Sequence, residues 1–339
     1  MEPTASGLEA IAARLREADK LLVVTHEHPD GDALGSLVAA QLLLTQLGKD
    51  SLMFVADSEF PLPYEYSFLS LERRIGEAPD DLDDRVLLFL DCGNLDRNPA
   101  AAALRRNGAT VLNVDHHHDN TNFGTVNHVD AKASCTAEIL WQLARELGAV
   151  LTGPIAEALY VGLLTDTGCF NYSNTTPRAH RMAADLIGVG VDVHAVYTHV
   201  YEGLPESKLA LLAHGLRRLE RYDDGRLTVS QLTAEDFADS GALESYSEGV
   251  IDHLRAVRGT AMAVLVRDRL AAGGGAYTEA DGARVRKVSL RAADERVDVS
   301  AIARGLGGGG HPAASGLTTT LPWDELVAFL RRELSEQLA

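Results

Sequence analysis

The sequence predicts an α/β fold with a mostly parallel sheet and helices on both of its faces, followed by a smaller α/β domain. Short apolar runs alternate with segments of helical spacing through the first 190 residues. Continuous apolar strands separated by helices are typical of a parallel sheet that is covered on both faces. Acidic and histidine-rich residues follow several of these runs, and ligands of such sheets bind at the carboxyl ends of the strands.

The first 190 residues form the predicted catalytic domain. Helices are expected to end where glycines follow the helical spacing, as at Gly48 and Gly108. The expected strands are Lys20–Thr25, Leu52–Ala56, Val86–Leu90 and Thr110–Val114. The expected helices are 7–18, Ala33–Leu47, Ala100–Asn107, Ser134–Leu147, Ile155–Leu164 and Thr176–Ile187.

Residues 191–225 have helical patterning and are expected to link this domain to a second one at 226–339. The Gly-rich stretch 273–275 predicts a hairpin loop between two strands of the second domain. The expected strands are Leu227–Leu232, Ala261–Arg267 and Val285–Arg291. The expected helices are Gly249–Val257, Val299–Leu306 and Pro322–Leu338.

Composition limits the possible classes of protein. With 339 residues, 46% hydrophobic and 24% charged, the chain is long enough for two globular domains. No apolar run approaches the roughly 18 residues of a membrane span, and the first residues lack the pattern of a signal peptide. Three scattered cysteines are too few for a disulfide framework. We therefore expect a cytoplasmic protein.

The net charge of −18 argues against a partner that is a long nucleic-acid duplex. Affinity for such polyanions depends on Lys and Arg that neutralise phosphates. A short phosphorylated substrate held by local cations remains compatible with this charge, and bound divalent ions would offset part of it.

The run His26-Glu27-His28-Pro29-Asp30-Gly31-Asp32 follows the first apolar strand and is rich in potential metal ligands. The spacing of His26, Asp30 and Asp32 lets one loop direct several ligands to one place. Imidazole and carboxylate together suit Mn²⁺, Fe²⁺ or Zn²⁺ better than Ca²⁺. A solvated turn at the end of a strand is the alternative for this loop taken alone.

Further clusters of the same kind follow later elements: Asp91, Asp115-His116-His117-His118 and Asp166. A buried carboxylate such as Asp91 must be paired, hydrogen-bonded or bound to metal. A helix-capping or turn aspartate is the alternative. Because His26, Asp91 and Asp115 each follow a predicted strand, we expect separate segments to converge on one metal site. The cysteines lack metal-binding spacing and are expected to pack near the site.

The stretch Gly307–Gly310, followed by His311, is the main feature of the second domain. Glycines allow the backbone to approach a ligand closely and to direct N–H groups at a phosphate. Arg286, Lys287 and Arg291 lie on the preceding strand, and cations with backbone donors suit a nucleotide phosphate. A flexible loop is the alternative.

These residues resemble the motifs of the DHH phosphoesterase superfamily, and Gly307–Gly316 resembles the glycine–histidine motif of the DHH-associated C-terminal domain. The likeness spans nearly the whole chain and is nearest to the NrnA group of nanoRNases that also act as pAp phosphatases. One departure is Pro312-Ala313-Ala314-Ser315, where a second glycine or other small residue is usual.

The resemblance implies roles for individual residues. One metal, most often Mn²⁺, would be held by His26, Asp30 and Asp91. A second would be held by Asp32, Asp91, His116 and Asp166, so that Asp91 bridges the two. His117 would act at the scissile phosphate, and Asp115 would orient the histidines. The residues expected to hold the far end of the substrate are Ser289, Arg291, Gly308, Gly309, Gly310 and His311.

The implied activity is two-metal hydrolysis of short oligoribonucleotides, of dinucleotides such as pApA and pGpG, and of pAp to AMP. A cleft between the two domains would limit the length of the substrate, and a homodimer is plausible by analogy. A cyclic-dinucleotide phosphodiesterase is the principal alternative because the same metal centre would serve both. An inorganic pyrophosphatase and a catalytically inactive nucleotide-binding module are the others.

Overall fold

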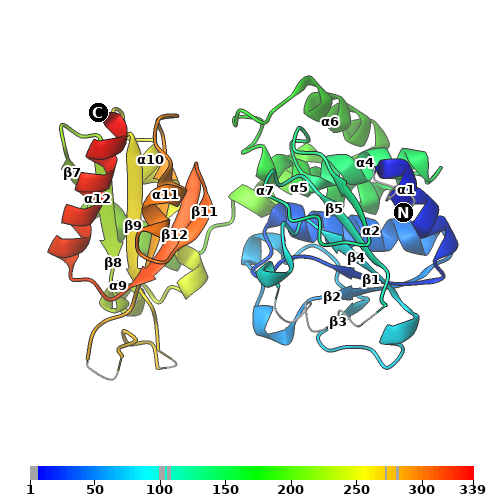
Figure 1. Ribbon diagram of the computed structural model, residues 1–339, viewed down its shortest axis with the longest axis horizontal. Helices are drawn as coiled ribbons and strands as arrows, with labels where there is room; N and C mark the ends of the chain where they lie inside the picture. The colour runs from blue at the N-terminus through cyan, green and yellow to red at the C-terminus, as the bar shows by residue number, and fades with distance from the viewer. Residues whose placement is uncertain (1–6, 99–103, 105–107, 272, 280–281) are drawn as a thin grey trace. The chain divides into compact units, whose positions relative to one another are not determined.

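The computed structural model describes residues 7–98, 104, 108–271, 273–279 and 282–339 and divides into two compact units (Figure 1). The units are Met1–Gly203 and Leu204–Ala339. Helix α7 (Val193–Tyr201) contributes buried side chains to the core of the first unit, whereas α8 (Glu206–Arg217) contributes to a core of the second. The residues expected to form a helical linker are thus divided between the two units.

The first unit contains a six-stranded sheet in the order β3-β2-β1-β4-β5-β6, and all of its strand pairs are parallel. The strands are β1 (Lys20–Val24), β2 (Asp50–Phe54), β3 (Arg74–Ile75), β4 (Val86–Leu90), β5 (Val111–Asp115) and β6 (Val126–Val129). The sequence did not predict β3, which has two residues, or β6, whose polar residues interrupt the apolar pattern. The predicted parallel α/β architecture is confirmed, whereas the α-helices in the described part of this unit pack on one face of the sheet and not on both.

Alternate residues of the strands face two apolar layers. Leu21 and Val23 pack with the helices, which Figure 1 shows gathered along one side of the sheet. Leu22 and Val24 face the other layer, to which 3-10 turns contribute. The described helices are α1 (Leu8–Glu17), α2 (Gly31–Gln46), α4 (Thr136–Glu146), α5 (Gly153–Asp166), α6 (Pro177–Val189) and α7. The helix expected at Ala100–Asn107 lies largely outside the described residues.

Short 3-10 turns connect several of these elements. They are η1 (Asp57–Glu59), η2 (Tyr64–Tyr66), η3 (Leu82–Asp84) and η4 (Leu95–Arg97), and the second unit has η5 (Glu244–Ser247).

None of the helices in the described part of the chain is long and apolar enough to cross a bilayer.

The second unit has a mixed six-stranded sheet in the order β11-β12-β10-β9-β8-β7, in which β8 and β9 are parallel. Its strands are β7 (Glu220–Tyr222), β8 (Leu227–Leu232), β9 (Met262–Asp268), β10 (Arg286–Ala292), β11 (Gly309–His311) and β12 (Ala314–Thr319). Helices α8, α9 (Ala234–Ser240) and α10 (Val250–Arg255) pack on one face. Helices α11 (Val299–Arg304) and α12 (Trp323–Leu338) pack on the other. A smaller α/β domain was predicted and is confirmed.

The glycine stretch differs from the prediction that a helix runs through Leu306 into a loop. Helix α11 ends at Arg304, and Gly309 begins an edge strand that pairs with β12. A side chain at Gly308 would place its Cβ 2.3 Å from the carbonyl oxygen of Gly316, so only glycine permits this approach. Gly310 has a φ of +133°, which also favours glycine. The glycines therefore serve strand pairing.

Candidate active site

Three adjacent strands of the first sheet deliver the predicted residues to one edge. Because β1, β4 and β5 are neighbours and parallel, their carboxyl ends lie side by side. His26 follows β1, Asp91 follows β4, and Asp115 ends β5. The segments that were expected to converge do so.

The loop after β1 supplies ligands and also begins helix α2. Asp30 is the N-cap residue, and its Oδ1 accepts bonds from the N–H groups of Asp32 and Ala33 at 3.1 and 3.0 Å. This is the usual capping role of an aspartate. The Asp30 side chain is nevertheless 60% exposed, and its Oδ1 lies 4.0 Å from Nε2 of His26. Asp30 can therefore cap the helix and contact an ion.

Asp32 lies within the first turn of α2 and is buried. The N-terminus of α4 points at its carboxylate: the N–H groups of Thr136 and Ala137 donate to Oδ2 and Oδ1 at 2.6 and 3.0 Å. The Ser36 hydroxyl also donates to Oδ1, at 3.2 Å. These donors fix the orientation of Asp32, and the positive end of the α4 dipole stabilises its charge.

The close contact between α2 and α5 brings Asp32 near the end of α5. A side chain at Gly35 would place its Cβ 2.4 Å from the carbonyl oxygen of Ala158. A side chain at Gly162 would place its Cβ 2.6 Å from Oδ1 of Asp32. The two glycines let the helices approach, and Asp166, the last residue of α5, then reaches the same site.

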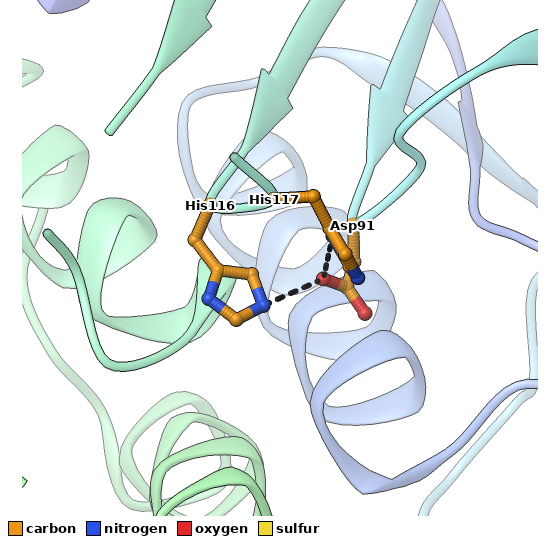
Figure 2. A group of neighbouring side chains, drawn as sticks. All are labelled: Asp91, His116 and His117. Atoms are coloured by element: carbon orange, nitrogen blue, oxygen red, sulfur yellow. Dashed lines mark ion pairs between the residues drawn. The ribbon is translucent and has the colours of Figure 1, made fainter. Parts of the chain in front are cut away.

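Asp91 is at the centre of the cluster and is fully buried. Its Oδ2 lies 3.5 Å from Nε2 of His26, and its Oδ1 lies 3.5 Å from Nε2 of His116. Figure 2 shows Asp91 beside His116 and His117. The Thr136 hydroxyl donates to Oδ1 at 3.0 Å. Asp91 also has a φ of +56°, an uncommon backbone conformation for a non-glycine residue that often occurs at functional sites.

His116 connects Asp91 to the remaining acids. Its Nε2 lies 4.0 Å from Oδ2 of Asp32 and 3.7 Å from Oδ2 of Asp166. Among the groups of potential ligand atoms that are compact enough to hold an ion, two sets match the predicted pair of metal sites. The sets are His26, Asp30 and Asp91, and Asp32, His116 and Asp166. Asp91 lies in one set and contacts His116 of the other.

His117 is held by Asp115. Its Nδ1 lies 2.7 Å from Oδ1 of Asp115, which is buried and also accepts from the Asn120 amide through Oδ2 at 2.6 Å. Burial opposes protonation of His117, but the bond to Asp115 and the charge of Asp91 outweigh it and raise the pKa of His117 to about 9. Cations bound nearby would lower this pKa again. Asp115 thus orients His117.

The carboxylates carry more negative charge than their protein partners offset. Burial raises the pKa of Asp32 well above its ordinary value, and the charges of Asp91 and Asp30 add to this effect. Burial and Asp32 likewise raise the pKa of Asp166. Burial also disfavours ionised Asp91, but His26 and the other histidines lower its pKa overall. Buried acids that crowd one another in this way need cations to offset their charge when they are ionised, so the donor set fits a metal centre.

Residues near the site that were not expected to bind metal have other environments. His28 is exposed and pairs with Glu59, its Nδ1 lying 3.1 Å from Oε2. Cys92 is buried and its thiol donates to the carbonyl oxygen of Asn94. Burial raises the pKa of Cys92 to about 12, so the thiolate that binds metals is not formed at neutral pH. His118 is exposed.

The candidate substrate-binding residues lie together in the second unit. Strand β12 pairs Gly316 with Ser289 and Gly309, and pairs Ala314 with Arg291 and His311. Directly opposed residues of antiparallel strands share a face, so Ser289, Arg291 and His311 lie on one face of this sheet. The small residues Gly316 and Ala314 separate them. Although the sequence departs from the family motif at Ala313-Ala314, Ala314 still places a small side chain between Arg291 and His311.

Several residues at the first site were not expected from the sequence. Asn174 donates to the carbonyl oxygens of Ser134 and Asp166, which ties the start of α4 to the end of α5. Glu138 is buried within α4, accepts from Ser134 and pairs with Arg178. No sequence pattern identifies the contacts of Asn174 or the pairing of Arg178 with Glu138, because these residues lie 8 to 40 positions apart in the chain.

Arg97, also unpredicted, approaches His117 from the side opposite Asp115, with a terminal nitrogen 3.3 Å from Nε2. Its only sequence signal is a basic residue in the turn that follows Asp91.

Comparisons with known proteins identify the family of this chain. A family profile described as the DHH family, N-terminal domain, matches residues 20–163. A Thermus thermophilus protein named bifunctional oligoribonuclease and PAP phosphatase NrnA is 34% identical over 93% of this chain and 90% of its own length. The Bacillus subtilis protein of the same name is 25% identical over 92% of this chain and 93% of its own length.

Solved structures show the same fold. An exopolyphosphatase-related protein from Bacteroides fragilis has a TM-score of 0.85 at 23% identity and covers 97% of this chain and 96% of its own. RecJ from Thermus thermophilus in complex with Mn²⁺ has a TM-score of 0.55 at 16% identity and covers 99% of this chain and 56% of its own. The metal-ligand clusters, the sheet order and the full-length relatives lead to one conclusion: this chain belongs to the DHH family and is a relative of the NrnA proteins.

Proposed function

We propose that this chain is a two-metal phosphoesterase that hydrolyses short oligoribonucleotides and dinucleotides to mononucleotides, and pAp to AMP. The observation that carries the proposal is that buried Asp91 lies between two compact sets of metal ligands. The names of the full-length relatives from Thermus thermophilus and Bacillus subtilis supply the substrate class.

The metal ligands are proposed from the chemistry of the donors. His26, Asp30 and Asp91 would hold one divalent ion, and Asp32, Asp91, His116 and Asp166 would hold the other. Mixed imidazole and carboxylate donors favour Mn²⁺ over Ca²⁺. The Mn²⁺ complex of RecJ from Thermus thermophilus, which shares the fold, is compatible with this choice.

The chemistry divides between the ions and the protein. When bound, a pair of divalent ions polarises phosphoryl oxygens and lowers the pKa of an attacking water. The chain itself orients the ligands: the α4 N-terminus fixes Asp32, and the Asp30 carboxylate is held by capping α2. His117, oriented by Asp115, is proposed to contact the scissile phosphate and to donate a proton to the leaving oxygen.

We propose that the second unit binds the other end of the substrate. Ser289, Arg291 and His311 share one face of the sheet. Gly309 and Gly310 lie in its edge strand β11, directly after Gly308, whose own N–H donates to the carbonyl oxygen of Ala303. An edge strand keeps unpaired N–H groups that can donate to a phosphate. This recognition would favour substrates with a terminal phosphate over a long duplex. A cytoplasmic location and a homodimer are further expectations of the proposal.

The experiment compares substrates on one preparation of the purified protein. Mn²⁺ content is measured, and kcat/KM is determined for pAp, pApA, pGpG, cyclic di-AMP, pyrophosphate and an RNA ladder of two to about ten nucleotides. We expect turnover of pAp and dinucleotides, a fall in kcat/KM with RNA length, and loss of activity in EDTA that Mn²⁺ restores.

The rival activities predict other rankings. The greatest kcat/KM for cyclic di-AMP would identify a cyclic-dinucleotide phosphodiesterase, and the greatest for pyrophosphate an inorganic pyrophosphatase. Absence of turnover despite bound Mn²⁺ would indicate an inactive nucleotide-binding module. Each of these results would refute the proposed function.

A further inference from the structure

The turn that carries Arg97 is fixed to the metal-binding loop by its backbone. Asn94 caps the turn by accepting from the N–H of Arg97 at 3.2 Å. The carbonyl oxygen of Arg97 accepts from the N–H of Glu27 at 2.8 Å. The next residue, Asn98, is buried and its amide donates to the carbonyl oxygen of Thr25 at 2.6 Å. The position of this turn therefore does not depend on the Arg97 side chain.

The guanidinium of Arg97 differs from the other partly buried guanidiniums of this unit. Arg85 pairs with Asp50 and Asp81, and Arg178 pairs with Asp130 and Glu138. Arg97 instead lies against His117, and in the described part of the chain no carboxylate lies within 4.0 Å of it. This is notable at a site that contains several aspartates, because acids close to a cation normally pair with it.

Most of the hydrogen-bonding capacity of Arg97 is unused by the described residues. A guanidinium has five N–H donors, and the contact with Nε2 of His117 uses one. A purely orienting role for Arg97 is the simpler alternative. However, Asp115 already orients the His117 ring through Nδ1, and backbone bonds already fix the turn. The remaining donors thus lie beside the residue that is proposed to meet the scissile phosphate.

We propose that Arg97 is a catalytic residue that binds the non-bridging oxygens of the scissile phosphate next to His117. The inference rests on the proposed phosphoesterase function. A planar guanidinium suits phosphate because two of its N–H groups can donate in parallel. A cation at this edge also reduces the repulsion between an anionic substrate and the acidic cluster, and stabilises charge that develops on the phosphoryl oxygens.

The contact between Arg97 and His117 places the two side chains at the same point of the site. A terminal nitrogen of Arg97 lies 3.3 Å from Nε2 of His117. A substrate phosphate bound at this point would therefore lie within reach of both side chains.

The test compares Arg97→Met, Arg97→Lys and the control Asp96→Asn. Asp96 is the exposed neighbour of Arg97 in the same turn, so its variant controls for changes to η4 itself. We expect Arg97→Met to lower kcat/KM for pApA about 10²- to 10³-fold, the usual effect of removing one donor to transition-state charge. Arg97→Lys should recover only part of this loss, since it keeps the charge but not the fork. Asp96→Asn should retain wild-type kinetics.

Two further measurements separate phosphate binding from a structural role. Mn²⁺ affinity and Tm should match the wild type in Arg97→Met, because Arg97 is not among the proposed ligands and its turn is held by the backbone. The product AMP, measured by calorimetry with Mn²⁺ present, should bind at least about tenfold more weakly to the variant. This binding readout requires no turnover.

Some results would overturn the inference. Arg97→Met with kcat/KM and AMP affinity within about threefold of wild type would exclude phosphate binding by Arg97. A large fall in Tm or in Mn²⁺ affinity would instead assign it a structural role. Failure of the wild type to cleave pApA and pAp would refute the proposed function separately, and the AMP measurement would still decide the role of Arg97.

Discussion

Replacement of Gly162 by alanine tests whether the close contact of α2 and α5 is what positions the metal ligands. The added Cβ would lie 2.6 Å from Oδ1 of Asp32 and 2.8 Å from Cβ of Ala137. Both neighbours are buried, and Asp32 is held by hydrogen bonds from α4. The new methyl group therefore cannot be accommodated by rotation of an exposed side chain.

The magnitude follows from two opposing effects. Alanine in place of glycine stabilises a helix interior by about 0.5–1 kcal/mol. Overpacking of a buried contact typically costs about 1–3 kcal/mol. Because two buried groups must move by several tenths of an ångström, we expect the cost to exceed the gain, with net destabilisation of about 1–2 kcal/mol. For a unit of this size that corresponds to a Tm lower by about 2–8 °C.

The Gly162→Ala substitution should also lower kcat/KM. Displacement of Asp32 misplaces a proposed ligand, and an error of about 1 Å in an active site can cost 10²-fold in rate. We expect kcat/KM for pApA to fall at least about tenfold and Mn²⁺ affinity to weaken. The assays are thermal unfolding, Mn²⁺ titration and steady-state hydrolysis.

Gly188→Ala is the matched control. Gly188 lies in α6, is exposed, and would place its Cβ at least 4 Å from any neighbour. This substitution should leave activity unchanged and stabilise the protein by about 0.5–1 kcal/mol. If Gly162→Ala also raised Tm and kept wild-type kinetics, the argument that helix approach sets the geometry of Asp32 would be wrong.

The remaining predictions concern the acids and their partners. Asp91→Asn should lower kcat/KM for pApA at least about 10³-fold and weaken both Mn²⁺ sites, because Asp91 is the proposed ligand that the two ions share. A metal titration that still showed two tight Mn²⁺ sites would contradict the bridging role. Arg178→Met leaves Glu138 buried without its ion-pair partner and should destabilise the protein by about 3–5 kcal/mol in urea unfolding, with recovery in the double variant that adds Glu138→Gln. Burial raises the pKa of Asp236, but bonds from the Thr233 N–H and from Arg218 outweigh it, so the pKa is lowered overall. Ionised Asp236 therefore stabilises the fold above its unfolded pKa of about 4 and this contribution is lost as pH falls through the lower folded value. The stability difference between wild type and Asp236→Asn should be larger at pH 7 than at pH 3, and a constant difference would refute this linkage.

Most of the first domain could be predicted because its signals are local. An apolar run such as Val86–Leu90 followed by Asp91 contains both the buried strand and the residue at its end. Parallel order then requires the ends of adjacent strands to meet at one edge. Strand β6 was missed because its local signal is weak. It has four residues with polar side chains among them, and its strand conformation depends on pairing with β5.

The second domain shows where a local signal was misread. Gly307–Gly310 has no side chains whose pattern could indicate a strand, so the sequence predicted a loop. Pairing of Gly309 with Gly316 makes part of it an edge strand, and that pairing depends on residues outside the stretch. Strand register in turn decides that Ser289, Arg291 and His311 share a face.

Local sequence patterns specify which chemistry is available: histidines and aspartates at strand ends, in the spacing from His26 to Asp32 that allows one loop to supply two sets of ligands. Long-range packing sets how these side chains are held. Contacts between distant segments place the α4 N-terminus on Asp32, allow α5 to approach through Gly162, and set Arg97 against His117. Such contacts depend on the packing of whole elements, and no pattern within a single segment encodes them.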